Sequence, residues 1–218
     1  MRRTEVLTGF ILIITAFSYL ASILLDFNFV SPYSSLQEDL AYLSEQIESQ
    51  HTSSLAWLTT GALTLISVPL YLIALHHRLK SLLYINALFM LGAAAGFLLM
   101  GKLGFDLNGN ISIAVVEGIE KVGDKTKFEL LEQFRKIQLL RLIGSSCVGL
   151  FAMGLSLSKF KLKRFPLFST GLLMICGPVL IFFNWYDPDH LIRTGAMAGI
   201  VIGMIVFSVR LINKGLSD

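Results

Sequence analysis

The chain has 218 residues, of which 54% are hydrophobic and only 15% are charged, and its formal net charge at pH 7 is +3. Soluble domains carry about a quarter charged residues, so this composition excludes an ordinary soluble protein and indicates an integral membrane protein. The cations lie between apolar runs rather than in one basic stripe, and the sequence therefore predicts no nucleic-acid partner.

Six apolar runs of about 19–21 residues follow one another along the chain, each long enough to cross a hydrocarbon core of roughly 30 Å as a helix. Within lipid, every backbone N–H and C=O must be bonded inside the chain, so each run is predicted to be helical. The predicted spans are residues 6–25, 55–75, 81–101, 139–157, 165–183 and 191–209. The sequence thus predicts an all-α, polytopic membrane protein whose single domain, residues 1–218, contains six transmembrane helices.

Lysine and arginine distinguish the two sides of the predicted bundle. The two termini, the linker between spans 2 and 3 and the linker between spans 4 and 5 together carry ten cations and two acids. Short loops rich in Lys and Arg stay in the cytoplasm. Both termini are therefore predicted to be cytoplasmic, and the protein to lie in the inner (plasma) membrane.

The loop between spans 1 and 2 is predicted to contain an extracytoplasmic amphipathic helix over residues 35–48. Ser35 and Glu38 have the spacing of a capping box. One helical face is apolar and is formed by Leu36, Leu40, Leu43 and Ile47. Such a helix would lie on the membrane surface or fold over the mouth of the bundle.

The loop between spans 3 and 4 is predicted to turn at residues 106–110, which include an Asn-Gly pair. A short apolar helix is expected to follow over 111–119. Thr126 and Glu129 form a second capping box, from which a helix of about 30 residues is predicted to run on into span 4.

Small residues at helical spacing predict where helices approach one another closely. They are Gly92 and Gly96 in span 3, Ser145 and Gly149 in span 4, and Gly195, Gly199 and Gly203 in span 6. Spans 3 and 6 are expected to pack through these faces inside the bundle. A homodimer through the span 6 stripe is the alternative.

Spans 2 and 5 each contain one proline, Pro69 and Pro178, which are expected to kink the two helices. Spans 1–3 and 4–6 therefore share the order plain helix, proline helix, glycine helix. With three spans in each half, the halves would be inverted relative to one another, as in many secondary transporters. This pattern supports a small transporter as an alternative function.

Side chains that carry chemistry are scarce near the membrane midplane. No Asp, Glu, Lys, Arg or His lies near the centre of a run, and the two cysteines, Cys147 and Cys176, are expected to be packing residues. The histidines have no partners at metal-ligand spacing. The sequence therefore predicts no metal, no cofactor and no catalytic residue, and an intramembrane enzyme acting on lipid head groups is kept as a further alternative.

Polar residues gather at the outer ends of the spans. One interpretation is snorkelling cations, their acidic partners and an aromatic belt. The other is a shallow pocket, roofed by the amphipathic helix, that binds a lipid, a small amphipathic ligand or a protein partner. The candidate ligand-binding residues are Arg141, Lys102, Arg193, Asp26, Asp106 and His190.

Arg141 is placed about one turn inside span 4, where an unpaired guanidinium is costly. It is predicted to pair with Asp26, Asp106 or Asp187, or with the anionic group of a bound ligand.

Four stretches carry a resemblance to a known family. They are the short basic start before a Gly-containing span 1, "LYLIALHHRLK" at the end of span 2, "GLFAMGLSLSKFKLKRFPLFSTGLLMICG" across the turn from span 4 to span 5, and "VRLINKGL" at the C-terminus. In these stretches the chain resembles a bacterial six-span integral membrane family catalogued only as a domain of unknown function. The resemblance implies a six-span fold and topology and carries over no activity or site residue.

Overall fold

The computed structural model describes residues 2–25, 44–75, 80–117, 123–161, 167–186 and 191–217, and in these ranges it contains helices and no strand. The helices are α1 (Arg2–Leu24), α3 (Ile47–Leu75), α4 (Lys80–Glu117), α5 (Asp124–Lys161), α6 (Leu167–Tyr186) and α7 (Leu191–Ser217). All six contain a segment long and apolar enough to cross a membrane, which confirms the predicted fold class.

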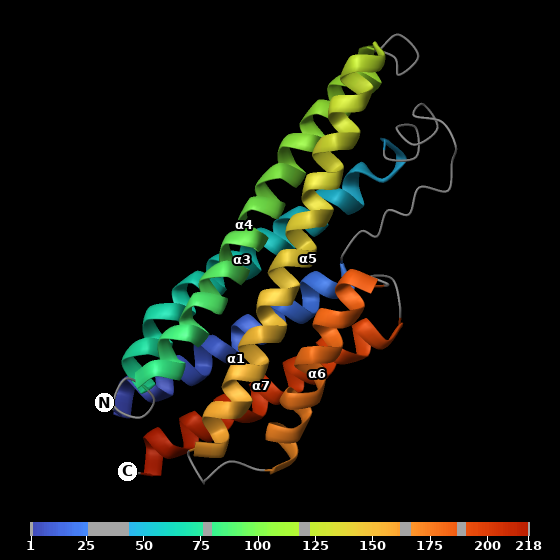
Figure 1. Ribbon diagram of the computed structural model, residues 1–218. Helices are drawn as coiled ribbons and strands as arrows, with labels where there is room; N and C mark the ends of the chain where they lie inside the picture. The colour runs from blue at the N-terminus through green and yellow to red at the C-terminus, as the bar shows by residue number, and fades with distance from the viewer. Residues whose placement is uncertain are drawn as a thin grey trace.

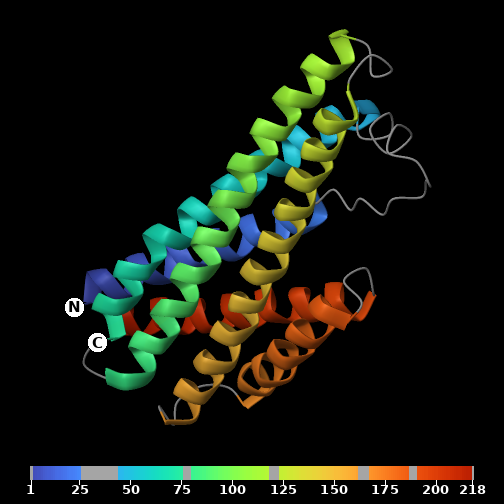
Figure 2. The same ribbon diagram turned by 45° about the horizontal axis from the view of Figure 1, so that its top comes forward.

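The helices form a closed ring in the order in which they occur in the chain. Each helix packs against the one before it and the one after it, and α1 packs against α7 to close the ring. Both termini lie at the same end of the molecule (Figures 1 and 2), which we call the inner end. At the opposite, outer end, α4 and α5 continue beyond the other helices as a long hairpin (Figure 1).

The order of the ring bears on the predicted inverted repeat. Two halves related by a twofold axis in the membrane plane look like mirror images when the helices are viewed end-on, so they would run around the ring in opposite senses. Here α1, α3, α4 and then α5, α6, α7 follow one another in a single sense. The ring therefore lacks the arrangement of an inverted repeat, although Pro69 and Pro178 do lie inside α3 and α6.

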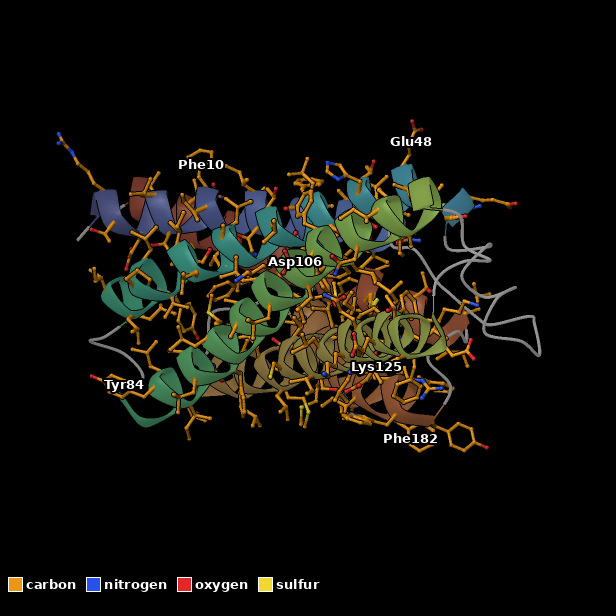
Figure 3. The ribbon with its side chains drawn as sticks, turned by 90° about the horizontal axis from the view of Figure 1, so that it is seen from above. Phe10, Glu48, Tyr84, Asp106, Lys125 and Phe182 are labelled. Carbon is orange, nitrogen blue, oxygen red and sulfur yellow. The ribbon has the colours of Figure 1, made fainter. Side chains whose placement is uncertain are left out.

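The outward face of the ring is apolar, as expected of a surface that meets lipid. On α1, Leu7, Phe10, Ile14 and Phe17 are each about half exposed and follow one another at helical spacing. Figure 3 shows Phe10 and Phe182 pointing away from the bundle on opposite sides. Soluble monomers rarely expose apolar stripes of this extent, so this surface supports a multi-pass membrane protein.

The predicted turn at residues 106–110 is wrong. Helix α4 continues through it to Glu117, so the expected separate helix at 111–119 is the last part of α4 as far as the structure describes it. The reason is packing: Leu107, Ile111 and Ala114 of α4 are buried in one cluster with Leu130 and Phe134 of α5. Burial of this apolar face outweighs the local turn preference of Asn-Gly.

The outer hairpin, residues 105–117 and 124–136, is called the stalk from here on. Helix α5 has 38 residues, about 57 Å at 1.5 Å per residue, which confirms the predicted unbroken helix into span 4. It begins two residues before Thr126, because the Lys127 N–H already bonds to the Gly123 carbonyl at 3.2 Å. The capping box predicted at Thr126 is therefore wrong.

The amphipathic helix predicted at 35–48 falls mostly on residues outside the described ranges. Its last two residues, Ile47 and Glu48, form the first turn of α3, which begins eight residues before the predicted start of span 2.

The glycines predicted to mark helix contacts do so between neighbours in the ring. A Cβ atom at Gly96 would lie 3.1 Å from the Gly144 Cα of α5, and one at Gly203 would lie 2.6 Å from the Leu173 side chain of α6. The expected faces are therefore packed, α4 against α5 and α7 against α6. Gly199 also meets α6, at Cys176, whereas Gly195 has nothing within 4 Å. The homodimer through this stripe stays a prediction.

Candidate functional site

A cavity lies at the base of the stalk, between α3, α4 and α5. Its volume is about 40 Å³, or about 410 Å³ with the empty space at its mouth included. Its polar lining consists of Gln50, Ser53, Ser54, Gln138 and Arg141. Its apolar lining comprises Trp57, Met100, Leu107, Phe134 and Ile137. The cavity thus offers hydrogen-bonding groups beside an apolar wall.

Two glycines of α4 set the close approach of α3 that forms one wall. A Cβ atom at Gly104 would overlap the Ser54 hydroxyl, and one at Gly101 would lie 2.8 Å from the Ser54 carbonyl oxygen. The Ser54 hydroxyl donates to the Gln50 carbonyl at 2.7 Å. Because only glycine leaves room here, the polar turn of α3 lies directly against α4.

Arg141 places a guanidinium in this cavity. The residue is only 5% exposed, and it lies on the face of α5 that also carries the buried residues Ser145 and Val148. A cation at this depth is costly in hydrocarbon, but less so where it lines a polar cavity or pairs with an anion. The cavity therefore provides a polar environment for the guanidinium at the depth predicted for it, about one turn inside span 4.

An aromatic layer closes the cavity on its inner side. The Trp57 ring lies 4.7 Å from the Phe97 ring and 6.0 Å from the Tyr19 ring, measured between centroids. Trp57 lines the cavity at the base of the stalk. Tyr19 and Phe97 line a second cavity of about 30 Å³, which lies nearer the centre of the helix bundle and has a mostly apolar lining. These three rings separate the two cavities.

The four predicted site residues that the structure describes are not gathered in one place. Arg141 lines the cavity, whereas Lys102 and Asp106 are exposed on α4 and do not line it. Asp26 and His190 lie outside the described residues.

Arg193 belongs to a second polar group at the outer end, formed by α5, α6 and α7. Its Nε–H donates to Asn184 Oδ1 at 2.7 Å, and both residues are buried. The Asn184 amide in turn donates to Ser146 Oγ at 3.3 Å, and the Trp185 indole N–H donates to the same oxygen at 3.1 Å. Arg193 therefore ties three helices together at a place different from the Arg141 cavity.

Sequence reasoning missed the α3 part of the lining. Gln50, Ser53, Ser54 and Trp57 have the spacing of one helical face, which is a readable signal. The first three residues precede the apolar run that begins at residue 55, so hydropathy alone places them in the loop.

Metal-ligating side chains do not converge in the part of the chain that the structure describes, where no three His, Cys, Asp or Glu residues could hold an ion together. Cys147 and Cys176 are free thiols that pack against Gly92 and Gly199, respectively.

Comparisons of the chain with protein-family models, with curated proteins and with solved structures find no match. The resemblance to a bacterial six-span family stays a prediction.

Proposed function

We propose that this protein binds the anionic group of a lipid or of another small amphipathic molecule in the cavity at the base of the stalk. The observation that carries the proposal is the buried Arg141 in the cavity wall. A guanidinium presents several N–H donors in a planar fork that matches phosphate and carboxylate oxygens.

The rest of the lining fits the same class of ligand. Gln50, Ser53, Ser54 and Gln138 supply further hydrogen-bonding groups, and Met100 and Phe134 supply apolar surface for an acyl or alkyl portion. The described lining residues include no His, Cys or carboxylate that would act as a general base or nucleophile. We therefore favour binding over catalysis.

Replacing Arg141 by glutamine should reduce retention of anionic lipid by about tenfold or more, because one charge-assisted contact is removed. Native mass spectrometry of protein purified with a mixture of phosphatidylglycerol and phosphatidylcholine measures the retained lipids. Arg135→Gln is the matched control, since Arg135 lies on the exposed surface of the same helix.

Pairing of Arg141 with Asp26, Asp106 or Asp187 would give a different result. Arg141→Gln would then lower stability while leaving lipid retention unchanged, and neutralising the partner acid as well would restore part of the stability. That outcome would contradict the ligand proposal.

We further propose that the protein lies in the cell membrane with its inner end in the cytoplasm, as the cation distribution indicates. Ser112 on the stalk and Asn213 near the end of α7 are both exposed. With Cys147 and Cys176 replaced by alanine, a membrane-impermeant maleimide added to intact cells should label Ser112→Cys and not Asn213→Cys. The reverse pattern, or labelling of both, would overturn the orientation.

A further inference from the structure

A larger hollow lies on the outer part of α3 and α4, and we call it the α3–α4 groove. Its volume is about 520 Å³, and it shares no lining residue with the Arg141 cavity. Its polar and aromatic lining side chains are Glu48, His51, Thr52, Phe105, Asn108 and Ser112. It lies at the level of the stalk, outside the predicted span 3.

Asn108 is the unusual member of this lining. The residue is only 4% exposed, yet neither its Oδ1 nor its Nδ2 atom forms a hydrogen bond among the residues that the structure describes. Buried side-chain amides in native proteins almost always have a partner, and an exception needs an explanation. Both amide atoms lie beneath the surface of the groove that Asn108 lines, so a ligand bonds to them only when the soft last torsion of the asparagine side chain rotates.

We propose that the α3–α4 groove binds a neutral carbohydrate through Asn108. A carboxamide both donates and accepts, as does each sugar hydroxyl, so the two groups satisfy one another. The volume lies within the range of small-molecule sites.

The other lining groups agree with this ligand class. The Phe105 and His51 rings pack edge to face with centroids 4.5 Å apart and offer apolar surface for the C–H face of a sugar ring. Glu48 adds an acceptor for further hydroxyls, and the lining residues that the structure describes include no lysine or arginine. The Glu48 carboxylate would repel an anionic ligand.

This site is independent of the Arg141 cavity, and the groove provides its own variants for a test. Gly109 lines the groove, and a Cβ atom there would meet nothing within 4 Å. Gly109→Phe should therefore fill the groove without disturbing helix packing, and Gly109→Ala is its matched control. Asn108→Leu removes the amide and keeps a similar shape.

The protein is reconstituted in phospholipid nanodiscs without sugar-headed detergent, and saturation-transfer NMR is recorded with glucose, N-acetylglucosamine and a blocked alanine dipeptide. The wild-type protein should transfer saturation to the sugars. Asn108→Leu and Gly109→Phe should each weaken sugar binding about tenfold, the effect of about one lost hydrogen bond or a blocked site, whereas Gly109→Ala should bind as wild type does.

The melting temperature without sugar separates a binding role from a structural one. It should stay level or rise in Asn108→Leu, because the substitution removes an unsatisfied buried amide. A fall in melting temperature, sugar binding that survives in both groove variants, absence of sugar binding by the wild type, or binding of the dipeptide alone would overturn the proposal.

Discussion

Replacing Gly177 by alanine should destabilise the protein by about 1–3 kcal/mol, the usual cost of forcing extra volume into a packed interface. A Cβ atom there would lie 2.7 Å from the Gly149 carbonyl oxygen, and the reciprocal atom at Gly149 would lie 2.8 Å from the Gly177 carbonyl oxygen. Both obstacles are backbone atoms, so the contact is relieved only if α5 and α6 move apart.

Gly171→Ala is the control on the same helix, because a Cβ atom at Gly171 meets nothing within 4 Å. That change should be neutral or stabilising by up to about 1 kcal/mol, since alanine has the higher helix propensity. Thermal unfolding in detergent, followed by circular dichroism, measures both variants. A Gly177→Ala protein as stable as Gly171→Ala would show that α5 and α6 do not meet at this pair.

Replacing Asn184 by leucine should lower stability by about 1.5–3 kcal/mol, because a buried guanidinium loses a hydrogen-bond acceptor. The Arg193 Nε–H donates to Asn184 Oδ1 at 2.7 Å, and Asn184 is fully buried. Adding Arg193→Met should restore part of the loss, since the pair is replaced by apolar side chains.

Asn110→Leu provides the comparison for this prediction. Asn110 is exposed on the stalk, and its amide donates to Gln133 Oε1 at 3.4 Å. Loss of such a surface contact should change stability by no more than about 0.5 kcal/mol. If Asn184→Leu were as mild as Asn110→Leu, or if the double variant were no more stable than Asn184→Leu, the network would not hold α6 and α7 together.

The six helices could be predicted because lipid imposes one rule on every run: the backbone must bond within the segment. Outside the membrane that rule no longer applies, and residues 106–110 show the consequence. Asn-Gly is a local turn signal, whereas the contact of Leu107 and Ile111 with Phe134 depends on a segment more than 20 residues away along the chain. Sequence reasoning had no means of weighing one against the other.

The depth of Arg141 within span 4 can be read from hydropathy, and the structure places it in the wall of a cavity with polar lining, whereas its pairing stays a prediction. Its grouping with Lys102 and Arg193 could not be read in this way. In lipid the outward and inward faces of a helix are both apolar, so hydropathy leaves open which face turns inward. The structure leaves Lys102 exposed and bonds Arg193 to Asn184.

Glycine spacing gave contact surfaces but not their partners. Gly92 and Gly96 meet α5, and Gly199 and Gly203 meet α6. A small residue indicates that another backbone comes close, whereas the partner helix follows only from the order of the helices in the ring. For the same reason, the sequence alone does not identify the close contact of Gly101 and Gly104 with α3 beside the cavity.

The proposal that the cavity binds an anionic group is tested most directly by Trp57, which lines it. The chain has two tryptophans, and Trp185→Phe leaves Trp57 as the single tryptophan whose emission is followed. Short-chain phosphatidylglycerol added to this protein in a neutral detergent should shift or quench the Trp57 emission with saturation, and short-chain phosphatidylcholine should do so at least about tenfold more weakly. The saturable response should disappear when Arg141→Gln is added. Equal responses to the two lipids, or an unchanged response in the Arg141→Gln protein, would contradict binding at this cavity.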